Sequence, residues 1–340
     1  MVSAESDKVL AVPTNVITGF LGVGKTTAIL ALLNQKPEGE RWAVLVNEFG
    51  EIGVDGSLVS GEASEEQGIY VREVPGGCMC CVSGLPMQIA LAQLLRRAKP
   101  DRLLIEPTGL GHPIEVLRTL SSEHNREVID LGPTITLVDA RNLSDGRYVT
   151  HETFLQQLEI ANVVVGNKED LYTDEDQARL ESFVESHCRK DARLVMTQQG
   201  KLSFDLLQGK PGISYAPAPE NSHDHHHSTD GEQTLASDLP IPESGMLSAS
   251  NEGEGFQSVG WRFAPTEVFE RESLHAFFRG LGVERMKAVF ITTDGIFGYN
   301  LTKDGFTETE LDDCAESRIE IIADSAKEEW EGKLLSCRAE

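Results

Sequence analysis

The chain has 340 residues, enough for two domains of ordinary size or one large domain with appendages. Its 30 Lys and Arg residues against 55 Asp and Glu residues give a formal net charge of −25, which repels a phosphate backbone and argues against nucleic acid as a partner. A hydrophobic fraction of 40% is ordinary for a soluble globular protein and too high for a wholly disordered one.

The start of the chain lacks the features of a membrane or secretory protein. The longest uncharged stretch there, between Lys8 and Lys25, is too short and too polar to span a bilayer. The residues before it lack the basic segment, apolar core and cleavage site of a secretory signal. We therefore expect a cytoplasmic protein with no membrane partner.

The first part of the chain alternates apolar runs with helical patterns. Patterns of buried strands lie at 9–18, 43–46, 69–74, 103–105, 134–138 and 162–165, and patterns of helices at 28–33 and 86–98. Strands that alternate with helices form βαβ units around a mostly parallel sheet. These patterns predict an α/β nucleotide-binding domain over residues 1–212.

The composition changes after this domain. From Ser214 to Phe256 the chain contains no Lys or Arg, and acidic residues alternate with Pro, Ser and Gly. Such a segment cannot bury enough apolar surface to offset the entropy lost on ordering. We predict a flexible acidic linker over residues 213–256.

Regular patterns resume after the linker. Strand patterns lie at 257–263, 287–292, 296–301 and 318–323, a helical pattern lies at 270–281, and Thr293-Asp294-Gly295 is typical of a tight turn. These patterns predict a small α+β domain over residues 257–340.

The strongest motif is GxxxxGKT at residues 19–26, between a predicted strand and a predicted helix. Glycines let the backbone N–H groups of such a loop turn toward the β- and γ-phosphates of a nucleotide. Lys25 supplies a positive charge there, and the hydroxyl of Thr26 is placed to ligate Mg²⁺. Because motif and context are both present, we interpret the loop as a P-loop rather than an ordinary Gly-rich turn.

A second motif, NKxD, consists of Asn167, Lys168 and Asp170. A carboxylate in a base pocket can accept from both N1–H and the exocyclic amine of guanine, whereas adenine presents an acceptor at N1. Asp170 therefore favours GTP over ATP, while Lys168 packs along the base and Asn167 ties this loop to the P-loop. The alternative is that Asp170 only caps a helix.

Between these motifs, Glu106 follows the predicted strand at 103–105 and begins the sequence Glu106-Pro107-Thr108-Gly109. Carboxylates at the carboxyl ends of strands in such sheets face the ligand crevice. Glu106 can hold Mg²⁺ through water or orient the attacking water, and the Gly109 N–H can contact the γ-phosphate. The alternative is a turn that only ends the strand.

Three cysteines, Cys78, Cys80 and Cys81, lie within four residues, whereas the other three are scattered. Closely spaced thiolates suit Zn²⁺ or another thiophilic divalent ion. Because three cysteines do not close a tetrahedral site, we expect a further ligand, with Glu48 and Glu51 as candidates. Buried unligated thiols and redox chemistry are the alternatives.

A short histidine tract lies inside the acidic linker. Imidazoles on such a segment can capture Zn²⁺, Ni²⁺ or Co²⁺ weakly, and neighbouring carboxylates raise the local cation concentration. The alternative is a solvated linker with no ligand role. The candidate ligands are His223, His225, His226 and His227.

Taken together, these motifs resemble the CobW-like family of P-loop GTPases, which are used in metal delivery. GFLGVGKTT, VLVNEFGE, GGCMCC, LLIEPTGLGHP and NKED follow the family order across about residues 13–171, and the chain from Gln257 resembles the small C-terminal domain of the family. The resemblance implies a P-loop NTPase fold, GTP hydrolysis with Mg²⁺, and metal binding at the cysteines. It assigns nucleotide binding to Gly22, Val23, Gly24, Lys25, Thr26, Thr27, Gly109, Asn167, Lys168 and Asp170, and catalysis to Lys25, Thr26 and Glu106.

The function expected from these motifs is that of a metallochaperone that couples GTP binding and hydrolysis to the binding of Zn²⁺ and its transfer to client proteins. A zinc buffer with incidental hydrolysis, a cobalt or nickel delivery GTPase, and an ATP-dependent kinase that shares only the P-loop are the alternatives. The client and the oligomeric state stay open, including a homo-oligomer.

Overall fold

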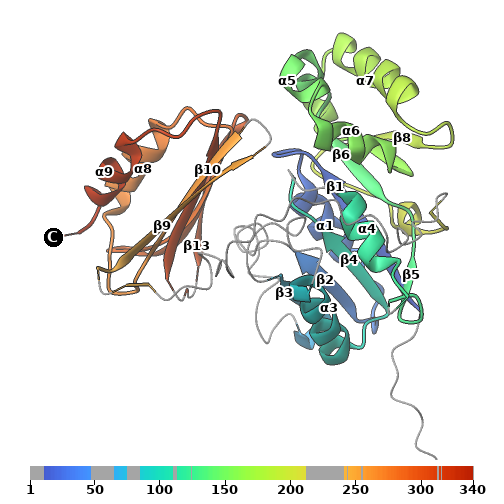
Figure 1. The fold of residues 1–340 in the computed structure, drawn as a ribbon, viewed down its shortest axis with the longest axis horizontal. Helices are drawn as coiled ribbons and strands as arrows, with labels where there is room; N and C mark the ends of the chain where they lie inside the picture. Colours follow the sequence, from blue (N-terminus) through green and yellow to red (C-terminus); the bar gives the residue numbers. More distant parts are fainter. Residues whose placement is uncertain are drawn as a thin grey trace, which may run out of the picture. The chain divides into compact units, whose positions relative to one another are not determined.

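The computed structural model describes residues 11–46, 65–74, 85–109, 113–123, 125–211, 241–242, 244–253, 256–311, 314 and 316–339 (Figure 1). They fall into two compact units, one formed by the described residues up to 211 and one by those from 241 onward. No helix within these ranges is long and apolar enough to cross a bilayer. The predicted end of the first domain at residue 212 and the predicted location in the cytoplasm stay predictions.

The first unit is built on a sheet whose described strands all pair in parallel. The strand order is β3-β2-β4-β1-β6-β7-β8, and β5 also pairs with β1. This confirms the predicted α/β architecture. The strands are β1 (Val12–Gly19), β2 (Trp42–Val46), β3 (Ile69–Glu73), β4 (Arg102–Glu106), β5 (Ile129–Leu131), β6 (Ile135–Val138), β7 (Val163–Gly166) and β8 (Arg193–Met196).

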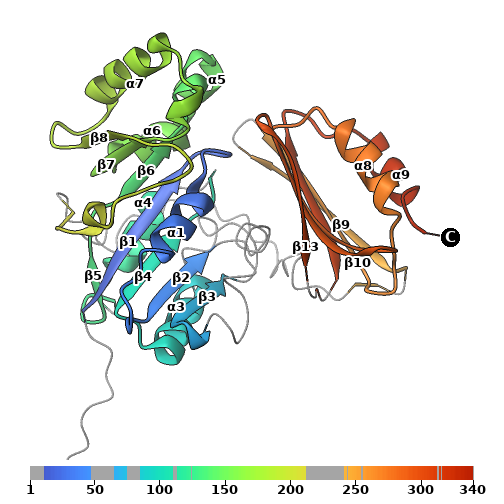
Figure 2. The same ribbon diagram turned by 180° about the vertical axis from the view of Figure 1, so that it is seen from behind.

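Helices cover both faces of this sheet (Figures 1 and 2). One face is covered by α3 (Leu85–Ala98) and α4 (Pro113–Leu120), which share one apolar cluster with β1, β2 and β4. The other face is covered by α1 (Lys25–Leu33), whose Ile29 and Leu32 are completely buried. The further helices described in this unit are η2 (Ala140–Ser144), α5 (Gly146–Val149), α6 (Glu152–Glu159), η3 (Glu169–Leu171), α7 (Asp174–His187) and η4 (Phe204–Leu207).

Because the strands are parallel, their carboxyl ends lie along one edge of the sheet. The P-loop follows β1, Glu106 ends β4, Asp139 follows β6, Asn167 follows β7 and Thr197 follows β8. The topology therefore brings together motifs that are far apart in the sequence.

The second unit is an antiparallel sheet with the strand order β13-β12-β11-β14-β10-β9. Its apolar cluster joins one face of the sheet to two helices, which lie side by side in Figure 1. The predicted α+β fold and the hairpin around Thr293 and Asp294 are both present. The elements are β9 (Met246–Gly253), β10 (Phe256–Phe263), α8 (Arg271–Arg279), β11 (Arg285–Thr292), β12 (Gly295–Thr302), β13 (Gly305–Leu311), β14 (Ser317–Ala323) and α9 (Glu329–Leu335).

Strand β9 corrects one prediction, because it lies inside the segment 213–256 that was predicted to be a flexible linker. It pairs with β10 along its whole length, from Met246 opposite Phe263 to Gly253 opposite Phe256. Met246 also packs against the core of this unit. A strand at the edge of a sheet gains its backbone hydrogen bonds without an apolar composition, so composition alone missed it.

Candidate functional site

The P-loop connects β1 to α1 in a conformation that requires glycine. Gly22 has φ +72° and Gly24 has φ +93°, values that other residues rarely adopt. A Cβ on Gly24 would come within 2.5 Å of the Asn167 side-chain nitrogen. A side chain at position 24 would therefore collide with Asn167 in the NKxD loop.

Lys25 is the first residue of α1, and its side chain folds back over the loop. The Nζ atom donates to the carbonyl oxygen of Phe20 at 3.3 Å, and the residue is only 4% exposed. The ammonium group is therefore held within the ring of backbone that the motif predicts as the phosphate site. Thr27, two residues further along α1, is exposed to solvent.

Thr26 and Glu106 meet across the sheet edge, as their predicted shared role in Mg²⁺ binding requires. The hydroxyl of Thr26 donates to the Glu106 carboxylate at 3.1 and 3.3 Å from its two oxygens. Glu106 is buried at 4% exposure. A hydroxyl and a carboxylate at this separation are the hard oxygen ligands that Mg²⁺ prefers, so the residues fit this ion.

The NKxD loop is tied to the P-loop through Asn167. Its side-chain amide donates to the carbonyl oxygen of Val23 at 2.9 Å and accepts from the N–H of Gly200 at 3.0 Å. The side chain is buried at 2% exposure. Asp170 is exposed, so its carboxylate is accessible from solvent. The structure thus supports the linking role predicted for Asn167.

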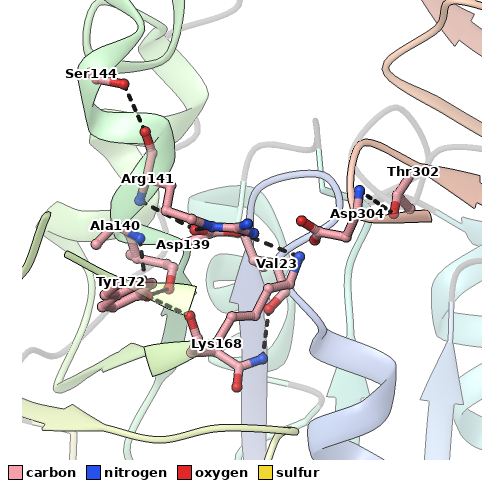
Figure 3. A network of polar contacts seen from close by, with 11 residues as sticks. Val23, Asp139, Ala140, Arg141, Ser144, Lys168, Tyr172, Thr302 and Asp304 are labelled. Atoms are coloured by element: carbon pink, nitrogen blue, oxygen red, sulfur yellow. Dashed lines mark hydrogen bonds and ion pairs between the residues drawn. The ribbon is translucent and has the colours of Figure 1, made fainter. Parts of the chain in front are cut away.

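Lys168 is held by a residue that the sequence analysis did not select (Figure 3). Asp139, at the carboxyl end of β6, lies 3.4 Å from Lys168 Nζ. The same carboxylate pairs with the Arg141 guanidinium through two contacts, at 2.9 and 2.5 Å. Asp139 is 3% exposed. Its position directly after a predicted strand, like that of Glu106, was an available signal.

Tyr172 fixes the backbone on both sides of this network (Figure 3). Its hydroxyl accepts from the N–H of Ala140 at 3.0 Å and lies within hydrogen-bond reach of the carbonyl oxygens of Val138 and Asn167. Burial raises the pKa of Tyr172 above its ordinary value, so the hydroxyl keeps its proton at neutral pH. The ends of β6 and β7 are joined in this way.

The loop after β8 completes this edge and was also missed. Gly200 has φ +65°, and its N–H reaches Asn167. The N–H of Glu169 donates to the carbonyl oxygen of Thr197 at 3.0 Å. This loop therefore supports the NKxD loop from the side of α1.

Gly109 lies against the P-loop, as its predicted contact with the γ-phosphate requires. A Cβ at this position would come within 2.9 Å of the Leu21 backbone nitrogen. The carbonyl oxygen of Gly109 accepts from the side-chain amide of Gln157 at 2.9 Å.

The proposed zinc ligands Cys78, Cys80, Cys81, Glu48, Glu51, His223, His225, His226 and His227 lie outside the described residues. Among the residues that are described, no group of His, Cys, Asp and Glu is arranged to hold a metal ion. Burial raises the pKa values of Cys188 and Cys337 to about 11, which makes them poor thiolate ligands at neutral pH.

The chain is similar to a known protein family, to curated relatives and to a solved structure. The model of the CobW/HypB/UreG nucleotide-binding domain matches residues 13–195. The protein named Zinc chaperone YeiR from Escherichia coli (strain K12) is 42% identical over 320 residues, covering 93% of this chain and 94% of that protein. The protein named Zinc chaperone CobW from Sinorhizobium sp is 30% identical over 240 residues, covering 63% of this chain and 67% of that protein. The crystal structure of the Zn(II)-bound YjiA GTPase from E. coli aligns over 97% of this chain and 99% of that chain, with 20% identity and a TM-score of 0.42.

Proposed function

Because the chain belongs to the CobW/HypB/UreG family, we propose that it is a GTPase that binds Zn²⁺ and acts as a metallochaperone. The observation that carries the nucleotide half of this proposal is the bond from Asn167 to the P-loop carbonyl of Val23 at 2.9 Å. This bond between the two loops supports a single site for the predicted guanine-reading and phosphate-binding motifs. Relatives named zinc chaperones, one of them 42% identical over 93% of the chain, support the metal half.

In the proposed reaction, water attacks the γ-phosphorus of GTP, the bond from this phosphorus to the β–γ bridging oxygen breaks, and GDP and phosphate leave. Lys25 and the N–H groups of the loop stabilise the charge on the phosphate oxygens. Glu106 orients the water or holds the metal ion through water. When bound through Thr26, Mg²⁺ neutralises charge on the β- and γ-phosphates.

The two strands that lead into the proposed zinc segments support the metal half of the proposal. Val46, the last residue of β2, is paired with Glu106 of β4. On the side of β3, its carbonyl oxygen accepts from the N–H of Val74 at 2.9 Å. Glu48 follows Val46 by two residues and Cys78 follows Val74 by four. At about 3.5 Å of reach per residue, these chain lengths allow a carboxylate and a thiolate from the two segments to share one ion.

The same register supports coupling between the ion and the nucleotide. Val46, which precedes the segment of Glu48 and Glu51, is paired with Glu106, which touches Thr26. Val74, which precedes the cysteine segment, lies one strand further from Glu106. A change in the phosphates can therefore bias the segments that hold the ion, and linkage requires the reverse effect as well. This is the physical basis that we propose for nucleotide-gated zinc transfer. The clients are metalloproteins that receive the ion.

Asp170→Asn tests the guanine assignment. The substitution replaces one of the two acceptor oxygens of the carboxylate with an NH₂ group, which donates. The affinity for GTP is therefore expected to fall by about 100-fold, while the affinity for ATP stays unchanged. Isothermal titration with each nucleotide and Mg²⁺ measures both. Glu169→Gln, which changes the adjacent exposed carboxylate in the same way, serves as the matched control. A GTP preference that survives in Asp170→Asn would remove the basis for this assignment.

A further inference from the structure

We propose that Gln157 is the positioning residue for Gly109, the glycine whose N–H is proposed to contact the γ-phosphate. This inference rests on the proposed function. It assigns to α6, which carries none of the recognised motifs, a part in distinguishing GTP from GDP.

The amide of Gln157 is fixed in a completely buried position. The residue is 0% exposed, and its Nε2 donates to the carbonyl oxygen of Gly109 at 2.9 Å. Its backbone carbonyl accepts from the hydroxyl of Thr136, on β6, at 2.7 Å. Because this second bond uses the backbone, it remains when the Gln157 side chain is changed.

Gly109 is enclosed on its other side by the P-loop. A Cβ added to Gly109 would lie 2.9 Å from the Leu21 nitrogen and 3.1 Å from the Phe20 carbonyl carbon. These are backbone atoms, which have little freedom to move away. Gly109 therefore lies between the phosphate-binding loop and the Gln157 amide, and a shift of Gly109 has to stretch the bond to Gln157.

Helix α6 is itself packed against the P-loop, so both supports of Gly109 belong to one assembly. The ring of Phe20, in the P-loop, is 1% exposed and contacts Phe154 in α6 with ring centres 6.1 Å apart. It also contacts His151, which precedes the helix, at 4.8 Å. A donor carried by this helix thus sets the distance between Gly109 and the loop that holds the phosphates.

Packing alone does not account for a glutamine at this place. The Oε1 atom of Gln157 is buried without a hydrogen-bond partner in the described structure. A buried polar atom without a partner is costly, and an apolar side chain of similar volume would avoid this cost. The residue therefore lowers the stability of the core while its other amide atom holds Gly109.

The test is Gln157→Met, which preserves most of the volume and removes the donor. Without the hydrogen bond from residue 157, binding of the γ-phosphate itself has to order Gly109. The affinity for a non-hydrolysable GTP analogue is therefore expected to fall about 5- to 10-fold, the loss typical of one hydrogen bond. The affinity for GDP, which lacks the γ-phosphate, should stay the same. Titrations of the whole chain with each nucleotide and Mg²⁺ measure the ratio. Gln156→Met, on the same helix, where the side-chain amide donates to the Glu152 carboxylate at 3.1 Å, is the matched control.

Gln157→Glu provides a second variant of the same shape. The protonated carboxyl group of Glu can donate to the carbonyl oxygen of Gly109, whereas the ionised carboxylate cannot. Burial raises the pKa of such a carboxyl group. Binding of the analogue, relative to wild type, should therefore be normal near about pH 6 and weakened near about pH 9. A purely structural role predicts that the affinity for GDP falls in parallel, so that the ratio of analogue to GDP affinity does not change with pH. An unchanged ratio of analogue to GDP affinity in both variants would overturn the proposal. A wild-type chain that fails to bind the analogue would instead contradict the proposed function.

Discussion

Replacing Lys25 with alanine is expected to slow GTP hydrolysis by about 100- to 1000-fold, the usual effect of removing one group that stabilises charge in a transition state. The side chain lies over the P-loop, with Nζ 3.3 Å from the carbonyl oxygen of Phe20 and only 4% of the residue exposed. Because the charge is already positioned before the nucleotide arrives, its loss affects the chemical step as well as binding. Phosphate release under single-turnover conditions measures this step.

The same variant separates a chaperone from a zinc buffer. Lys25 is not one of the proposed zinc ligands, so the zinc-binding capacity of Lys25→Ala should be retained while zinc transfer to a client is lost. Lys36→Ala, which removes a lysine bonded to the carbonyl oxygen of Glu40 at 2.7 Å, is the control and should leave hydrolysis unchanged. Unchanged zinc transfer by Lys25→Ala would favour the buffer.

Gly200→Ala is expected to destabilise the nucleotide-binding unit by about 2–4 kcal/mol, because backbone strain and overpacking both contribute. Gly200 has φ +65°, and an added Cβ would lie 2.6 Å from the Ala28 nitrogen and 2.8 Å from the Thr27 carbonyl carbon. Both contacts are with the backbone of α1 and cannot be relieved by a rotamer change. Chemical denaturation of the nucleotide-free protein measures the loss.

Gly39→Ala isolates the strain from the overpacking. Gly39 also has a positive φ, +84°, but nothing lies within 4 Å of its added Cβ, so its substitution should cost about 1 kcal/mol. Equal losses in the two variants would show that the loop after β8 does not press on α1 as described. A weakened GTP affinity is expected only for Gly200→Ala, because its N–H holds Asn167.

The parts of the candidate site that the sequence could predict are those with a local signature. A Gly-rich turn between a strand and a helix defines the P-loop, and Glu106 and Asn167 each follow a run of apolar residues. Since parallel strands end at one edge, the meeting of Thr26 with Glu106 follows from the fold class.

The parts that were missed depend on contacts between distant residues. Gly200 carries no motif and becomes a functional candidate only when the loop after β8 places it beside Asn167. Asp139 follows a predicted strand, but its contact with Lys168 depends on the pairing of β6 with β7. Gln157 would be read as an ordinary helix residue, because its burial is decided by the strand and loop packed on α6.

Among the secondary structure elements, α7 and β9 were missed for different reasons. The start of α7 has an available signal, since Thr173 and Asp176 form a capping box. Strand β9 has none of comparable strength, because its pairing with β10 replaces the apolar burial that a composition rule looks for.

The central claim, that nucleotide and zinc bias each other, is tested most directly by measuring zinc affinity in two nucleotide states. The purified chain is titrated against a chromophoric zinc chelator with GDP or with a non-hydrolysable GTP analogue, each with Mg²⁺. We expect affinities that differ by about tenfold, a coupling of about 1.4 kcal/mol, and loss of the binding in a Cys80→Ser, Cys81→Ser variant. The same tight affinity in both nucleotide states would contradict nucleotide-gated transfer.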